Sequence, residues 1–272
     1  MTTRAIAVVA VAFGLAAAVS SIGKASGMAG ATVIPASPGV AGMASRGTRV
    51  SFEFTPSTVP RHAYAAGAIH VHLRTAVPRR TRASRIQFDF DDHFKFAPGS
   101  APTCHREDIS NSQVDMATAM ARCGSASIGS GTAKATDGST TLEPCVLVFN
   151  GAREDGAATV LLFVRVRFSP PVADCSHPAA NHSGNTSLLV RGFLAHSRLR
   201  GYRKALRFNR LNGAEPLPLT DLDLTLQKGD YISAHCSSAD SERGWRLRTK
   251  VGYVKPRRVQ RVEATQRCRR GP

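Results

Sequence analysis

The sequence predicts a mainly β protein: an antiparallel β-sandwich, or a barrel-like fold, with one short α-helix and disulfide staples. Two observations lead to this prediction. Apolar and polar residues alternate in many short segments that are separated by Gly, Pro and Asp turn residues. Six cysteines follow an N-terminal segment of the kind that directs export, and cysteines of exported chains form disulfides.

Residues 1–25 have the order of a secretory signal peptide. The basic start ends at Arg4, an uncharged apolar run covers Ala5 to Val19, and small residues follow. Cleavage after Ser20 or after Ala25 fits the small-residue rule. An uncleaved anchor is the alternative, but the run is shorter than the ~20 residues that span a membrane. We expect a secreted, extracellular or cell-wall protein with no stable transmembrane segment after processing.

The rest of the chain divides into a tether and one domain. Residues 26–47 are rich in Gly, Ala, Ser and Pro, show no hydrophobic period, and are typical of a flexible linker. Residues 48–272 are the expected single β-rich domain, which is long enough to bury a substantial core.

Alternation of apolar and polar residues indicates half-buried strands along this domain. The first three are centred on Phe52, Val71 and Phe88, with Pro-containing turns between them. Val160 to Val164 is apolar throughout, which is typical of a central strand. The later strands are predicted at 127–135, 144–150, 158–168, 187–196, 219–226, 231–236, 244–254 and 259–268.

One helix is expected between Ile109 and Arg122, with Ser110 or Asn111 as its cap, because apolar residues recur there at helical spacing. The glycine-containing segment 128–132 follows it. That segment lacks the Gly-Lys-Ser/Thr ending and the strand–loop–helix setting of a phosphate-binding loop. We interpret its glycines as positions where two backbones approach closely.

The six cysteines are expected to form three disulfides. Loop-closure entropy favours near neighbours in sequence, and each bridge would restrict the unfolded chain by roughly 3–4 kcal/mol. Zinc binding is the alternative, but the chain has no C-x-x-C pair. The simplest pairing is Cys104–Cys123, Cys145–Cys175 and Cys236–Cys268.

The formal net charge is +17, and the C-terminal region is especially basic. On the strand that follows Gly244, alternate residues from Trp245 to Tyr253 would face inward, so the cations between them would face outward. A hairpin would place these beside the cations of the turn and return strand. A charged edge that only prevents pairing with other sheets is the alternative to a binding surface. The basic hairpin residues are Arg246, Arg248, Lys250, Lys255, Arg257, Arg258, Arg261 and Arg267.

Such a hairpin would attract anionic polymers, so we expect an anionic cell-wall polymer or an acidic polysaccharide as partner. Nucleic acid is disfavoured, because Trp245 and Tyr253 are assigned to the inner face and are not available to stack on bases. No cofactor is expected.

Two groups of residues would suit a metal or catalytic site. His70 and His72 share one strand face, so both imidazoles could bind one ion if the fold supplied another ligand. The segment Asp89–Asp92 gathers carboxylates that could hold Ca²⁺ or act as an acid/base pair. A solvated strand face and pairing with arginines are the simpler explanations, so no catalytic residue is assigned.

Several short pieces of sequence resemble one protein family. They are Ala101-Pro102-Thr103-Cys104 and residues 122–133, 219–224 and 231–236, with a last strand that ends at Cys268. From about residue 85 onward, the chain resembles uncharacterised exported, cysteine-containing proteins of high-GC Gram-positive (actinobacterial) bacteria. The resemblance implies secretion, a β-rich fold and the pairs Cys104–Cys123 and Cys236–Cys268, but no activity.

Together these observations predict a secreted or cell-envelope-associated, non-catalytic β-sandwich protein that binds anionic polymers through its basic C-terminal hairpin. The alternative is an extracellular hydrolase or metalloenzyme that uses His70 and His72 or the Asp89–Asp92 group.

Overall fold

The computed structural model describes residues 47–60, 63–75, 83–136, 141–166, 186–209, 219–236, 244–254 and 257–271. All of these residues belong to one compact unit. The predicted signal peptide, the linker up to residue 46, Cys175 and Lys255 lie outside the described ranges.

The main sheet has twelve strands, each antiparallel to its neighbours. In spatial order they are β1 (Arg49–Thr55), β4 (Ala68–Arg74), β13 (Leu219–Leu226), β7 (Ser127–Thr136), β9 (Cys145–Glu154), β10 (Ala157–Val166), β11 (Thr186–His196), β12 (Tyr202–Asn209), β5 (Ala83–Asp91), β15 (Trp245–Tyr253) and β16 (Arg258–Gln266), with β8 (Thr141–Leu142) beside β7.

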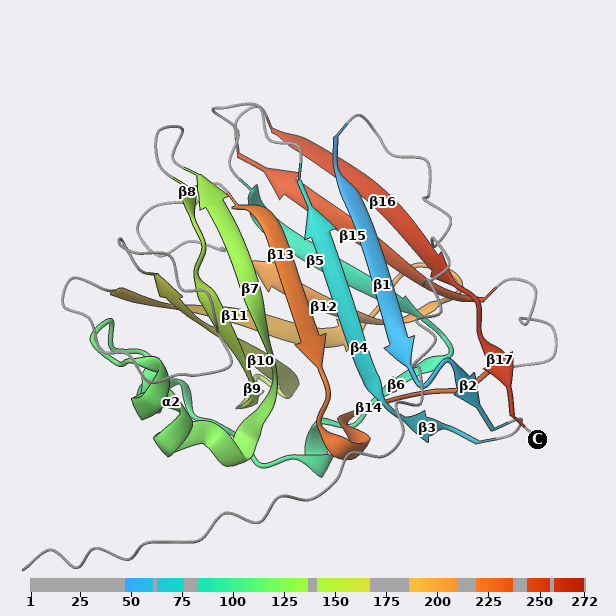
Figure 1. Ribbon diagram of the computed structural model, residues 1–272, viewed down its shortest axis with the longest axis horizontal. Coiled ribbons are helices and arrows are strands. Elements are labelled where there is room, and N and C mark those ends of the chain that lie inside the picture. Colours follow the sequence, from blue (N-terminus) through green and yellow to red (C-terminus); the bar gives the residue numbers. More distant parts are fainter. Residues whose placement is uncertain are drawn as a thin grey trace, which may run out of the picture. The chain divides into compact units, whose positions relative to one another are not determined.

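The sheet curls until its first and last strands meet. β1 and β16 are the two ends of the strand order, and they lie side by side (Figure 1). Side chains join them: Gln266 Oε1 accepts a hydrogen bond from Phe54 N at 2.6 Å, and Gln266 Nε2 donates to Phe54 O at 3.1 Å. Further along this seam, the Thr48 hydroxyl donates to Gln260 Oε1. The nearly closed, barrel-like form confirms the predicted fold class.

The barrel interior contains the main hydrophobic core. On β15 the alternate residues from Trp245 to Tyr253 are all buried, as the period-two pattern predicts. Aromatic rings fill one part of this core: the ring centroids of Phe54, Phe94 and Trp245 lie 5.1–5.9 Å apart. The indole N–H of Trp245 donates to the carbonyl of His235 at 2.8 Å, so its polar group is satisfied.

A second, smaller core lies on the outer face of β9 and β10. Leu161 and Phe163 belong to this core, whereas Val160, Leu162 and Val164 belong to the barrel interior. β10 is therefore buried on both faces. This explains its uninterrupted apolar run and confirms the predicted central strand.

Two helices supply the other side of the second core: α1 (Arg106–Ile109) and α2 (Met116–Cys123), which continues into the 3₁₀ turn η2 (Gly124–Ala126). α2 begins later than predicted, because Asp115 is its N-cap and accepts a hydrogen bond from Thr118 N at 2.6 Å. The predicted Cys104–Cys123 disulfide is present, with 5.3 Å between the Cα atoms, and it fixes the end of α2.

Gly129 and Gly131 lie where β7 meets the backbone of β13. A Cβ atom on Gly129 would be 2.0 Å from Thr225 O, and one on Gly131 would be 1.9 Å from Asp223 O. Only residues without a Cβ permit this approach. The interpretation of these glycines as positions of close backbone contact is therefore confirmed.

The remaining described elements lie in small sheets and turns. The Cys236–Cys268 disulfide is present as predicted, with 5.9 Å between the Cα atoms, whereas the pair Cys145–Cys175 includes a residue outside the described ranges. In the described part of the chain, no helix has both the length and the apolar character needed to cross a membrane. The remaining elements are a sheet of β3 (Ala65–Ala66), β14 (Ile232–Ala234) and β6 (Phe94–Phe96), the parallel pair β2 (Thr58–Val59) and β17 (Arg269–Arg270), and the 3₁₀ turns η1 (Pro98–Ser100) and η3 (Gly229–Tyr231).

Candidate anion-binding surface

Cations gather on the outer face of four adjacent strands, β12, β5, β15 and β16. In one cross-strand row, Arg207 is opposite Gln87, Gln87 is opposite Lys250, and Lys250 is opposite Arg261. Neighbouring strands lie ~4.8 Å apart, so three spacings place the backbones of Arg207 and Arg261 about 14 Å apart. We call the outward cations of these strands the cationic face: Arg85, Arg207, Arg246, Arg248, Lys250 and Arg261.

The cations of this face differ in exposure. Arg85 and Arg261 are exposed, whereas Lys250 keeps only 23% of its side chain accessible. The predicted outward direction of Arg246, Arg248 and Lys250 agrees with their half-buried positions between fully buried neighbours on β15. Of the other predicted hairpin residues, Arg257, Arg258 and Arg267 are exposed at or beyond the ends of β16, and Lys255 lies outside the described ranges.

Asp89 is buried behind the cationic face and contacts side chains from three segments of the chain. Its Oδ1 accepts hydrogen bonds from Gln87 Nε2 at 2.7 Å and Ser197 Oγ at 2.9 Å, and its Oδ2 lies 3.4 Å from Lys250 Nζ. The carboxylate is fully buried. Asp89 therefore positions Lys250 and is not accessible to a substrate.

Asp91, at the next outward position of β5, also positions a residue of the cationic face. Its Oδ2 accepts a hydrogen bond from Arg246 N at 2.5 Å, and its Oδ1 accepts one from His93 N at 3.1 Å. The Arg246 guanidinium lies over the Tyr202 ring, 5.3 Å from its centroid. Burial, together with the nearby Glu263 carboxylate, raises the pKa of Tyr202, so this phenol stays protonated beside the cations.

The four strands of the cationic face carry few acids. Within their described residues, the acidic side chains are Asp89, Asp91 and Glu263. The first two are fully buried, and only Glu263 is exposed to solvent. The accessible part of the face is therefore strongly positive, which favours contact with a polyanion.

His70 and His72 lie on the outer face of a different part of the barrel, on β4. Each imidazole is engaged by an aspartate of β13: His70 Nε2 lies 2.8 Å from Asp223 Oδ1, and His72 Nε2 lies 2.8 Å from Asp221 Oδ1. Their Nε2 atoms thus serve two separate pairs and are not directed at one shared ion. The arrangement agrees with the simpler explanation of a polar outer strand face.

The Asp89–Asp92 group is divided by the fold. Asp89 faces Lys250, whereas Asp91 and Asp92 lie near His93, whose Nδ1 is 3.2 Å from Asp91 Oδ1 and 3.5 Å from Asp92 Oδ1. Ligand atoms of Asp91, Asp92 and His93 are close enough to surround a metal ion. However, both oxygens of Asp91 already accept backbone hydrogen bonds, which supports a structural role for this carboxylate.

Two members of the cationic face, Arg85 and Arg207, are not among the predicted basic residues. Arg207 lies on β12, a strand that was not predicted, although Leu206 and Phe208 alternate with Arg207 and Asn209 there. Arg85 lies on a predicted strand, β5, but its neighbours were unknown. Only the pairing of β5 with both β12 and β15 brings these arginines beside the C-terminal hairpin.

The fold and the surface define a disulfide-linked, antiparallel, barrel-like β protein with a cationic outer face. No family model, no curated protein and no solved structure matches this chain.

Proposed function

We propose that this is a secreted or cell-envelope-associated binding protein whose cationic face binds an anionic polymer, either a cell-wall polymer or an acidic polysaccharide. The observation that supports this function best is the row from Arg207 to Arg261, which places three cations and the uncharged Gln87 across four adjacent strands. A linear polyanion lying across the strands would meet Arg207 first, Lys250 two strand spacings further on, and Arg261 one spacing beyond it. Guanidinium groups suit this contact because their planar fork matches phosphate, sulfate and carboxylate oxygens.

Three observations support export. The N-terminal segment has the order of a signal peptide, the resemblance is to exported proteins, and two disulfides occur among the described cysteines. Disulfides persist in oxidising compartments. The described polar contacts support binding more than catalysis, because Asp89 and Asp91 are occupied by protein partners.

The test is retention on immobilised heparin and on anionic wall polymer at rising salt. We expect the wild-type protein to bind at low salt and to elute as salt screens the charges. A triple variant, Arg207→Ser, Lys250→Thr and Arg261→Thr, should elute at much lower salt. Flow-through of the folded wild type at low salt would refute the proposed function.

A matched control separates a defined surface from net charge. Arg106, Arg153 and Arg122 are exposed and lie outside the cationic face. Replacing all three by Ser removes the same charge, so this control should elute close to the wild type. Equal loss of retention in both variants would show that net charge alone causes binding.

A further inference from the structure

The cationic face continues across the seam of the barrel. Two side-chain contacts cross the seam: Gln260 of β16 contacts Thr48, which directly precedes β1, and Gln266 of β16 contacts Phe54 of β1. The partners of each contact are 212 residues apart in sequence. The two strands therefore run parallel at the seam. The same offset places Arg49 at the level of Arg261, and both are exposed on outward positions.

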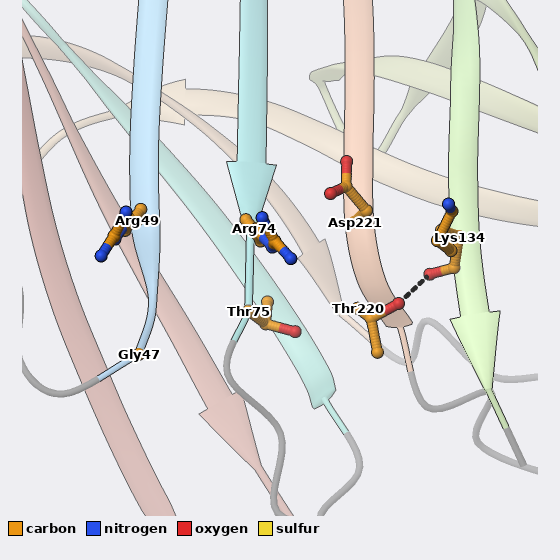
Figure 2. Close-up of a pocket in the computed structure, with 7 residues that line it drawn as sticks. All are labelled: Gly47, Arg49, Arg74, Thr75, Lys134, Thr220 and Asp221. Atoms are coloured by element: carbon orange, nitrogen blue, oxygen red, sulfur yellow. Dashed lines mark hydrogen bonds between the residues drawn. The ribbon is translucent and has the colours of Figure 1, made fainter. Parts of the chain in front are cut away.

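Beyond the seam, a row of charged residues crosses four strands. Arg49 is opposite Arg74, Arg74 is opposite Asp221, and Asp221 is opposite Lys134. Figure 2 shows these side chains on the adjacent strands β1, β4, β13 and β7. They line an open hollow of about 750 Å³ together with Gly47, Thr75 and Thr220.

Arg49 and Arg74 are like charges on neighbouring strands. Their Cα atoms are direct cross-strand partners, an arrangement that is destabilising for two cations. Within the described part of the chain, neither guanidinium has a hydrogen bond or an ion pair. An anion bound between them would relieve the repulsion and satisfy both forks at once.

The other polar groups of the hollow already have partners. Asp221 is bound by His72, and Lys134 Nζ lies 2.5 Å from Glu143 Oε1; this contact raises the pKa of Lys134. The Thr220 hydroxyl donates to Lys134 O at 3.1 Å (Figure 2), and the Thr75 hydroxyl donates to a backbone carbonyl. The two arginines are thus the groups left to bind a ligand.

We propose that this hollow binds a phosphate group of an anionic polymer whose chain continues from the cationic face across the β16–β1 seam. The proposal rests on the proposed function. Under this proposal the ligand is a phosphate-bearing polymer. It would extend around the barrel from Lys250 past Arg261 to Arg49 and Arg74. Lys250 and Arg261 are direct cross-strand partners, as are Arg49 and Arg74, and the seam joined by side chains lies between the two pairs.

Binding of long-chain polyphosphate tests this path. We expect the double variant Arg49→Ser, Arg74→Thr to lose at least tenfold in affinity for the long chain. The control Arg106→Ser, Arg153→Ser removes the same charge and should lose less than twofold. Inorganic phosphate is the second probe, and the side-chain N–H resonances of Arg49 and Arg74 should shift with it saturably in the wild type. Thermal melting should show both variants folded.

The outcomes separate the two proposals. Suppose that the double variant binds polyphosphate normally and the Arg207, Lys250 and Arg261 triple variant binds it more weakly. This result would contradict phosphate binding in the hollow and leave the proposed function in place. Equal losses of polyphosphate affinity in the double variant and its control would also contradict phosphate binding in the hollow. If the wild type binds inorganic phosphate at these two arginines but no polymer, the polymer path is wrong. Absence of any polyanion binding by the folded wild type would refute both.

Discussion

Gln266 of β16 binds Phe54 of β1 through both ends of its side-chain amide, and this contact joins the first and last strands of the sheet. The amide acts as one more peptide group: it accepts from the Phe54 N–H and donates to the Phe54 carbonyl. The backbone of Phe54 would otherwise lack these partners beside a fully buried side chain. A closed form is thereby obtained without a backbone ladder between β1 and β16.

Replacing Gln266 should destabilise the barrel. The change Gln266→Met keeps the length of the side chain but leaves two backbone groups of Phe54 without their partners, so we expect a loss of about 1–3 kcal/mol in the free energy of unfolding. Chemical denaturation measures it. Gln227→Met is the control, because Gln227 is exposed, and it should change stability by less than about 0.5 kcal/mol. Equal effects would contradict the role given to the seam.

Gly131 should not tolerate a side chain. In Gly131→Ala the new Cβ would lie 1.9 Å from Asp223 O, so β7 or β13 must shift, and we expect a loss of about 2 kcal/mol or more. Gly99→Ala is the matched change at a glycine with open space, and it should be nearly neutral. Melting temperatures of the two variants provide the comparison. A neutral Gly131→Ala would mean that these strands do not meet as described.

Asp89 should affect both stability and binding. Asp89→Asn removes the charge that faces Lys250 and disturbs the hydrogen bonds from Gln87 and Ser197, so we expect about 1–3 kcal/mol less stability. Polyanion retention should move to higher salt, because a negative charge behind the cationic face is lost. Glu263→Gln, at an exposed acid of the same face, should strengthen retention with little change in stability. Unchanged stability in Asp89→Asn would show that the buried carboxylate is not structural.

Tyr231 should make the protein sensitive to alkali. Its hydroxyl is buried without a hydrogen-bond partner among the described residues, and burial raises the pKa of Tyr231. Below the ordinary tyrosine value near pH 10, folded and unfolded chains both keep the proton. Above it the unfolded chain releases the proton first, so stability falls as pH rises.

Tyr231→Phe tests this. The variant should be more stable by about 1 kcal/mol at neutral pH, because an unpaired buried hydroxyl is removed. It should also lose less stability than the wild type between pH 9 and 11. Tyr64→Phe is the control, since Tyr64 is 39% exposed. Identical alkaline profiles for Tyr231→Phe and the wild type would show that Tyr231 is not the group responsible.

Much of the local structure could be predicted because it depends on near neighbours. The alternation from Trp245 to Tyr253, the close approach at Gly131 and the two described disulfides were all predicted and are present. The start of α2 was placed wrongly, because several polar residues precede it and only the hydrogen bond to Asp115 identifies the cap. β12 was missed, and with it Arg207.

The surface depends on contacts between distant parts of the chain. The basic hairpin was recognised from its charges, but β5 and β12 complete the cationic face, and the seam brings Arg49 to the level of Arg261. Alternation alone specifies which residues of a strand point outward, because successive side chains of a strand point to opposite faces. Which strands become neighbours is decided by burial of a shared core and closure of the barrel, and these depend on the whole chain at once.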